Sequence, residues 1–143
     1  MRLTDYIKSK LRSFQGSKVE LNKMKAPLLE IDEALKSFAK VHGMVVSKNY
    51  HDWPERSLEW SRNNIHRLIE IWLEDEKEMT FNFWICASLD KGGKRYWKNM
   101  YIRKNASFID IRENLQELLK ESIETLESWN ETDLHFATAL SLK

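Results

Sequence analysis

The chain has 143 residues, which fits a single domain with a buried core, and its net charge is only +1. A composition of 42% hydrophobic and 31% charged residues is that of an ordinary globular protein and argues against a disordered chain. The single cysteine, Cys86, excludes an internal disulfide and a cysteine-rich zinc site. No apolar stretch approaches the roughly 20 residues of a membrane span, and the start lacks a signal-peptide pattern, so we expect a cytoplasmic protein.

The charge is unevenly distributed along the chain. Residues 1–26 carry seven basic and two acidic side chains, whereas residues 105–143 carry eight acidic and three basic ones. The two ends could attract each other, within one chain or across a dimer, or the first could be a basic arm for nucleic acid or an anionic membrane. We expect one domain, with residues 1–26 as a basic helix and connector and residues 27–143 as the compact core.

Two helices are predicted in the N-terminal third. The first has apolar residues at helical spacing from Leu3 to Phe14, with lysine and arginine on its other face. Pro27 suits the first turn of the second helix, and Gly43 is well placed to end it.

From Met44 onward the pattern takes the period of two that is typical of strands. We predict a short strand at residues 44–46, a loop from Asn49 to Arg56 and a weak strand around Leu58 and Trp60. Three clearer strands follow, at residues 65–74, 79–89 and 94–103. The turns between the last four strands are short, at residues 63–64, 75–78 and 90–93, and short turns favour antiparallel neighbours.

The helical period returns after the strands. Ser107 and Asp110 resemble a helix N-cap followed by an acidic first turn, and one apolar stripe then continues to Trp129. A separate short helix is predicted over residues 134–140. The predicted fold is therefore an α+β domain, an antiparallel meander of four to five strands flanked by N-terminal helices and a long C-terminal helix.

Motifs for catalysis, metals or cofactors give no specific signal. The densest set of possible ligands, His51 with Asp52 and Glu55, is explained by a polar loop, and the glycines at residues 92–93 are explained by a hairpin turn. Cys86 lacks the signature of a nucleophile and is interpreted as a packing residue, while Glu70 and Glu74 are interpreted as solvated charges. We therefore expect no cofactor, no metal and no catalytic residue, and a binding protein rather than an enzyme.

The most informative feature is that aromatic residues occur on both phases of the strands. In the run from Met79 to Leu89 the odd positions form a continuous apolar face, yet Trp84 lies on the even, polar phase. Such a face is normally polar, so either the flanking helices or a partner must cover it. Six residues of this face are predicted to bind: His66, Trp72, Trp84, Arg95, Trp97 and Tyr101.

These residues predict a non-enzymatic intracellular binding module that holds a protein partner, or a second copy of itself, on an aromatic sheet face. Trp72→Ala or Trp84→Ala should then weaken association more than folding. Two alternatives stay open: a small-ligand domain with a pocket between sheet and helix, lined by Trp60, Trp72, Trp84 and His66, or nucleic-acid binding by the basic N-terminal helix with Arg95 and Arg103. The layout resembles that of the small immunity proteins and antitoxins of bacteria.

Overall fold

The computed structural model describes residues 18–47 and 54–136, with the backbone alone for residues 18–26. Helix α2 (Lys18–His42) precedes the sheet, and helices α3 (Phe108–Glu113) and α4 (Leu115–Ser128) follow its fifth strand. A short 3-10 helix, η1 (Glu131–Asp133), then leads to the last strand. The strands are β1 (Val45–Ser47), β2 (Glu55–Arg62), β3 (Ile65–Asp75), β4 (Thr80–Lys91), β5 (Lys94–Ser107) and β6 (His135–Phe136).

The sheet is a simple meander. The spatial order of its six strands is the chain order, and every neighbouring pair is antiparallel. The predicted α+β meander is confirmed, with six strands instead of four or five. Two of its turns are as predicted, because Asn63, Asn64, Gly92 and Gly93 all have the positive φ that two-residue hairpin turns of this kind require.

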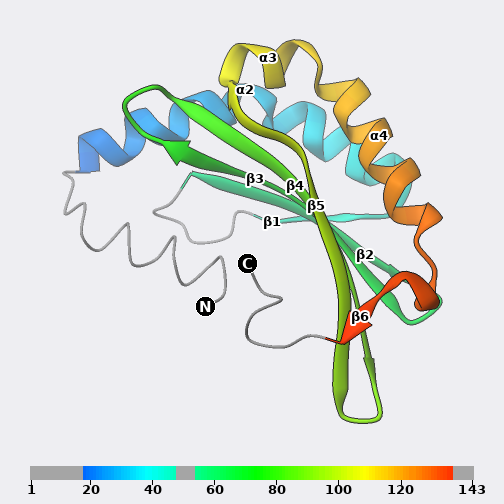
Figure 1. Ribbon diagram of the computed structural model, residues 1–143. Coiled ribbons are helices and arrows are strands. Elements are labelled where there is room, and N and C mark those ends of the chain that lie inside the picture. Colours follow the sequence, from blue (N-terminus) through cyan, green and yellow to red (C-terminus); the bar gives the residue numbers. More distant parts are fainter. Residues whose placement is uncertain (1–17, 48–53, 137–143) are drawn as a thin grey trace.

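All helices of the described part lie on one face of the twisted sheet (Figure 1). Leu28, Ile31 and Leu35 of α2 and Leu118 and Leu119 of α4 are buried there in one core with the strands. The strands contribute the other large members of this core: Leu58, Ile69, Ile71, Phe81, Phe83 and Ile85. The opposite side of the sheet, which we call the second face, therefore has no described helix packed on it.

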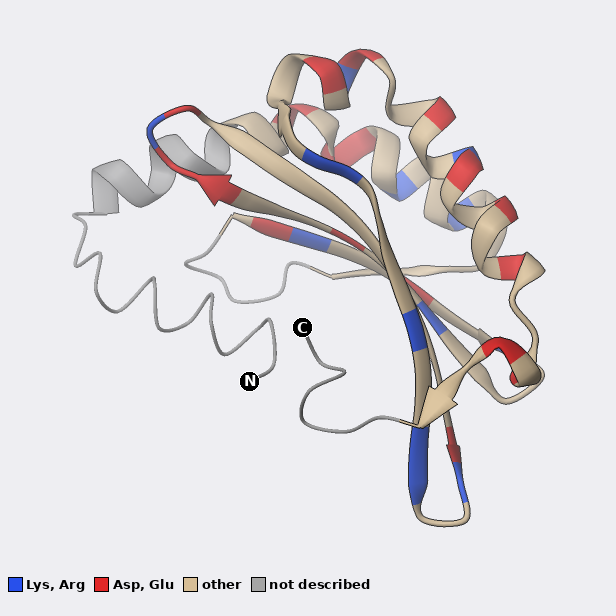
Figure 2. Cartoon of the chain, in the orientation of Figure 1, with Lys and Arg blue, Asp and Glu red and all other residues tan. Residues whose placement is uncertain are grey.

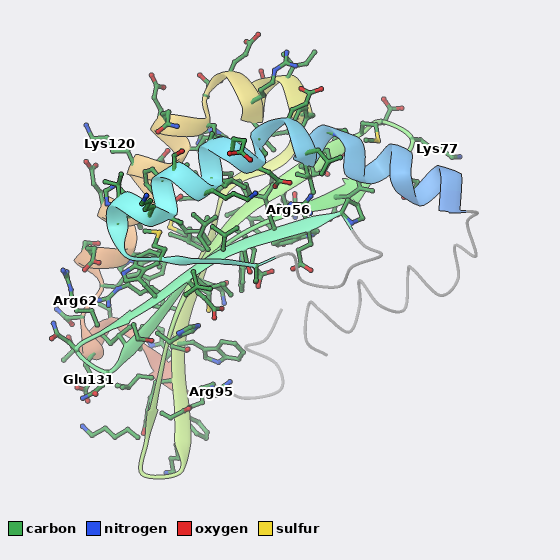
Figure 3. All side chains as sticks on the ribbon, turned by 180° about the vertical axis from the view of Figure 1, so that it is seen from behind. Arg56, Arg62, Lys77, Arg95, Lys120 and Glu131 are labelled. Carbon is green, nitrogen blue, oxygen red and sulfur yellow. The ribbon has the colours of Figure 1, made fainter. Side chains whose placement is uncertain are left out.

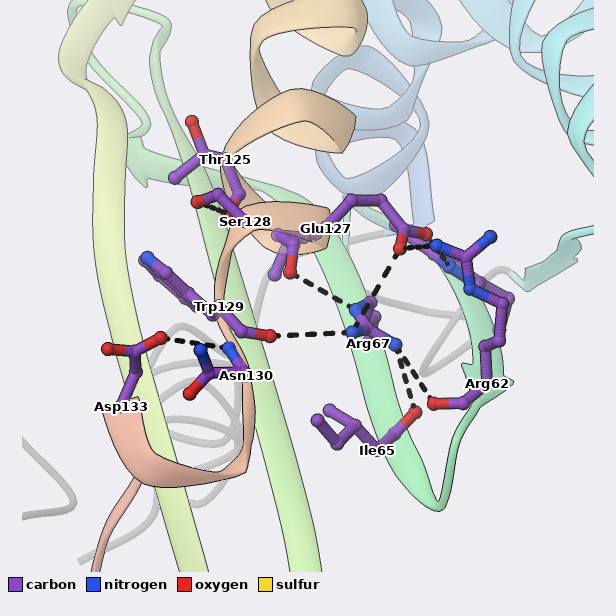
Figure 4. Close-up of polar contacts among 11 residues, drawn as sticks. Arg62, Ile65, Arg67, Thr125, Glu127, Ser128, Trp129, Asn130 and Asp133 are labelled. Atoms are coloured by element: carbon purple, nitrogen blue, oxygen red, sulfur yellow. Dashed lines mark hydrogen bonds and ion pairs between the residues drawn. The ribbon is translucent and has the colours of Figure 1, made fainter.

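Two buried arginines fasten the helices to the sheet. Arg56 of β2 lies between α2 and the sheet (Figure 3) and donates to Asp32 of α2 over 2.7 and 3.4 Å. Arg67 of β3 donates to the carbonyl oxygen of Leu126 over 3.1 Å and to that of Trp129 over 3.5 Å (Figure 4). Each guanidinium thus supplies several hydrogen-bond donors to oxygen atoms between the helices and the sheet.

Several predicted boundaries differ from the structure. Helix α2 begins at Lys18, so Pro27 lies inside it, because the preceding lysine, glutamate, leucine and methionine residues favour a helix strongly enough to continue through the proline. Its end at His42, before Gly43 with φ 67°, is as predicted.

The loop predicted to Arg56 is wrong at its end, where Glu55 and Arg56 open β2. Its residues 49–53, and the first predicted helix from Leu3 to Phe14, lie outside the described residues.

The prediction of one long C-terminal helix is also wrong in one respect. Ser107 caps it as predicted, accepting from the Asp110 amide over 3.2 Å, but the helix breaks at Asn114. The Asn114 amide and side chain both donate to the Asp110 carbonyl, at 3.1 and 3.0 Å, which ends α3 before α4 begins.

The prediction of a separate helix over residues 134–140 is wrong for residues 134–136, which are the part of it that the structure describes. His135 and Phe136 form β6, and the Phe136 ring packs on Tyr96 of β5 at 5.9 Å between centroids. This ring contact is long-range and leaves no signal in the local sequence. Residues 137–140 lie outside the described part of the chain.

Candidate binding face

The strand register brings the six predicted site residues to the second face. Glu70 of β3 is opposite Trp84 of β4, and Trp84 is opposite Tyr101 of β5. Trp72 lies two residues beyond Glu70 on the same face. Further along the strands, His66 is opposite Ser88 and Ser88 is opposite Trp97, with Arg95 beyond them beside the hairpin turn. The six residues therefore form two groups.

The first group is an aromatic cluster of Trp72, Trp84 and Tyr101. The Trp72 and Trp84 rings meet edge to face at 5.9 Å between centroids, and the Trp72 and Tyr101 rings lie 6.0 Å apart. Trp72 is only 2% exposed and Trp84 is half-buried, whereas Tyr101 is 38% exposed. Trp72 is thus the packed floor of the cluster, and Tyr101 is its accessible ring.

The second group is polar and lies toward the β4–β5 hairpin. The His66 ring is 3.1 Å from the Ser61 hydroxyl and 3.7 Å from the Glu59 carboxylate. The half-buried Trp97 has an indole N–H with no acceptor within the described residues. Arg95 pairs with Asp90 at 2.8 Å, in the hairpin (Figure 3). Six residues separate Arg95 from Tyr101, or about 20 Å of strand, so Arg95 is not part of the aromatic cluster.

Two buried carboxyl groups lie beside the aromatic cluster. Glu55 is opposite Trp72, and Glu70 is opposite Ser57, so the two acids are diagonal neighbours on the second face. Glu55 is 0% exposed and Glu70 is 5% exposed. The interpretation of Glu70 as a solvated charge is therefore wrong, because this part of the second face is closed to solvent. Glu74 is half-buried and accepts from Asn82 over 2.7 Å.

The environment of Glu55 keeps its carboxyl group protonated. Burial is the largest cause that raises the pKa of Glu55 from 4.5 to about 9, and a hydrogen bond with the neighbouring Glu70 carboxyl and the charge of that group also contribute to this rise. Apart from Glu70, neither carboxyl oxygen of Glu55 has a hydrogen-bond partner among the described residues. Sequence reasoning missed Glu55 as a member of this face, because it was assigned to a loop, where neither strand phase nor burial could be deduced.

Cys86 lies on the same face and is buried with a free thiol. Burial and then the Glu70 charge raise the pKa of the Cys86 thiol to about 12, so the thiol is neutral at physiological pH. A neutral, buried thiol is a poor nucleophile and packs as a small apolar residue. Within residues 18–47 and 54–136, no three histidine, cysteine, aspartate or glutamate side chains are grouped so that they could hold a metal ion.

The four residues expected to line an aromatic pocket are divided between the two sides of the sheet. Trp60 is opposite Arg67 on the helix side and donates to Glu127 of α4 over 3.1 Å. Trp72, Trp84 and His66 lie on the second face. A cavity of about 370 Å³ does adjoin Trp60, at the end of α2, but its lining includes none of the other three.

Strand β5 also carries exposed side chains that are not among the six predicted site residues. Met100, on the helix side of β5, is 40% exposed, and Arg103 and Lys104 are exposed as well. Arg103 was expected on the same face as Tyr101. The register shifts opposite Phe83, and Arg103 instead lies 3.7 Å from Glu121 of α4. The signal for this strand is its composition, five basic residues and no acidic one in Lys94–Ser107.

Comparison with known proteins identifies no relative. No family model, no curated protein and no solved structure matches this chain. In the described part of the chain, no helix is both long enough and apolar enough to cross a membrane.

Proposed function

We propose that this chain is a non-enzymatic, cytoplasmic binding module that holds a protein partner against β5 and the adjoining aromatic cluster of the second face. The observation that carries this proposal is the arrangement of Tyr101, an accessible ring supported from behind by buried Trp72 and half-buried Trp84. An aromatic side chain held by rigid packing loses little entropy on binding, and such residues dominate the energetics of protein interfaces.

The charges of this region favour a protein over a nucleic acid. The second face carries Glu70 and Glu74 close to the aromatic cluster, and these acids would oppose the phosphates of a strand stacked on Trp84 and Tyr101. The basic residues of β5 argue against a second copy of the chain as the partner. Two β5 strands placed side by side would repel each other. A different protein is therefore the partner that fits best.

Site-specific photo-crosslinking tests the proposal. The photoreactive residue benzoylphenylalanine replaces Tyr101 in one sample and Val41, which is 79% exposed on α2, in the control. In an extract of the cells that produce the protein, we expect a discrete protein adduct from position 101 only, reduced severalfold by Trp84→Ala in a variant checked for native circular dichroism. Equal adducts from both positions, or adducts made only of nucleic acid or of the chain itself, would show the proposal to be wrong.

A further inference from the structure

Strand β5 forms an open edge of the sheet over part of its length. On one side it pairs with β4 from Lys94 to Ser107. On the other side β6 pairs only with Tyr96 and Trp97, and beyond them no strand of the described chain lies beside β5 (Figure 1). At such an edge, alternate residues direct their backbone N–H and C=O groups away from the sheet, where another strand can bind them.

The open segment has defined limits. It begins at Lys98, directly after the pairing with β6, and ends at Ile102, whose carbonyl oxygen accepts from the Arg103 guanidinium over 2.6 Å. The register with β4 also becomes irregular here, opposite Phe83. Five residues, Lys98 to Ile102, are a usual length for one strand of a sheet.

Both faces of this segment offer apolar contacts to an added strand. Met100 is opposite Ile85 on the helix side, and Tyr101 is opposite Trp84 on the second face. They are 40% and 38% exposed. Since the side chains of a strand alternate between two faces, an added strand would contact both Met100 and Tyr101.

The side chains of β5 itself carry only positive charge. Lys94, Lys98 and Lys104 lie over the rings of Phe136, Trp129 and Tyr101, at 5.5, 5.1 and 5.2 Å from the ring centroids. In the described residues none of these three lysines forms an ion pair with a carboxylate, whereas Arg95 and Arg103 do. Figure 2 shows the basic residues spaced along β5, with acidic residues on the neighbouring helix α4.

This charge selects among possible strands. Two copies of β5 placed edge to edge would bring their lysines together, which disfavours self-pairing, as lysines on sheet edges commonly do. A strand with acidic side chains would instead form ion pairs with Lys98 and Lys104. Charge complementarity therefore distinguishes an acidic partner from a second copy of the chain.

We infer that the partner binds by strand addition: an extended, acidic segment pairs with β5 from Lys98 to Ile102 and adds a further strand to the sheet. This inference rests on the proposed function and specifies its mode, backbone pairing at the β5 edge with apolar contacts to Met100 and Tyr101.

A titration of the isotope-labelled full chain with synthetic peptides tests strand addition. The probe is a capped eight-residue peptide of alternating glutamate and valine pairs (EEVVEEVV), which places both residue types on each face of an extended strand. One matched peptide carries lysine for glutamate, and another carries proline at its two central positions. We expect the acidic peptide alone to slow amide hydrogen exchange within Lys98–Ile102. The double variant Lys98→Glu/Lys104→Glu should bind it about tenfold more weakly, whereas Lys77→Glu, in the exposed β3–β4 turn, should leave the affinity unchanged.

Four results would overturn strand addition. These are equal binding of the proline peptide, no change in exchange at Lys98–Ile102 with up to millimolar peptide, tighter binding of a single-stranded oligonucleotide at the same residues, and dimerisation of the chain through β5 in sedimentation. If position 101 still crosslinks to a discrete protein in any of these cases, the proposed function stands and only its mode is wrong. Loss of that crosslink would remove the proposed function itself.

Discussion

Single buried side chains decide the chemistry of the second face. Glu55 is a fully buried acid, placed beside Trp72 and diagonal to Glu70. Its charged form is disfavoured by burial, which is the physical cause of its raised pKa, about 9. The other titratable groups on this face near it are Glu70, Glu74, Cys86 and Tyr101, and burial also raises the pKa of the Cys86 thiol and of the Tyr101 hydroxyl.

The raised pKa of Glu55 predicts a pH-dependent stability. In the unfolded chain Glu55 ionises near pH 4.5, whereas in the folded chain it keeps its proton to about pH 9. Its contribution to folding is therefore fully present below pH 4.5 and is lost progressively as the pH rises to about 9. Glu55→Gln cannot ionise, so we expect it to flatten this slope and to raise the free energy of unfolding at pH 7 by up to about 3 kcal/mol.

Urea denaturation of both proteins at several pH values measures this effect. Glu59→Gln, on the same strand but half-buried, is the matched control for the loss of one carboxylate. A Glu55→Gln variant that keeps the wild-type pH slope, or that is less stable than wild type at pH 7, would contradict the assignment of Glu55 as a protonated buried acid.

At the scale of elements, hydrogen bonds from buried arginines connect the helices to the sheet. The C-terminal end of α4 meets β3 at Arg67, whose guanidinium donates to the Leu126 and Trp129 carbonyls and, over 3.1 Å, to the Arg62 carbonyl (Figure 4). Burial lowers the pKa of Arg67, although the charge of Glu127 nearby opposes this shift. The planar fork of an arginine reaches several carbonyls at once, which a lysine cannot do.

Arg67→Lys should therefore loosen the end of α4. We expect it to lower the free energy of unfolding by about 1–3 kcal/mol, since buried carbonyls lose their donors. Hydrogen exchange should accelerate first in Leu126–Trp129 and leave the β3–β4 amides protected. Arg62→Lys, on an exposed side chain that pairs with the same Glu127, is the control and should change stability by less than about 1 kcal/mol. If hydrogen exchange accelerated equally across the whole sheet, Arg67 would not stabilise the end of α4 specifically.

At the scale of the whole molecule, the sheet divides the protein into a covered side and a second face. The helices of the described part all pack on the first, and their core contains neither Trp72 nor Trp84. The tryptophans of the second face therefore do not pack against these helices. Because Trp72 is nevertheless buried, it serves folding, and the accessible part of the face is displaced toward Tyr101 and the β5 edge.

This division predicts opposite effects for two aromatic residues. The burial of Trp72 reverses the expectation that its loss mainly weakens association: Trp72→Ala should lower the free energy of unfolding by about 3–5 kcal/mol. Tyr101→Ala should lower it by no more than about 1 kcal/mol but reduce binding of the acidic peptide severalfold. Thermal unfolding with peptide titration separates the two effects. Equal destabilisation by both variants would place Tyr101 in the folding core.

Local signals in the sequence were enough for most of the secondary structure. The period of two identified strands β2 to β5, the Asn63-Asn64 and Gly92-Gly93 pairs identified their turns, and Ser107 identified a helix start. These features depend on residues that are close in the chain, so their physical causes can be recognised without knowing the fold. The alternation also showed correctly that both phases of the strands carry large aromatic residues.

The tertiary structure alone decided which face the helices cover, where Glu55 and Glu70 lie, and that β5 keeps an open edge beyond its two-residue pairing with β6. Each of these depends on contacts between residues far apart in the chain. Alternation specifies that a strand has two faces, but the solvent exposure of a face depends on what packs against it. The sequence therefore determined most of the elements and their order, and packing determined which of their residues a partner can contact.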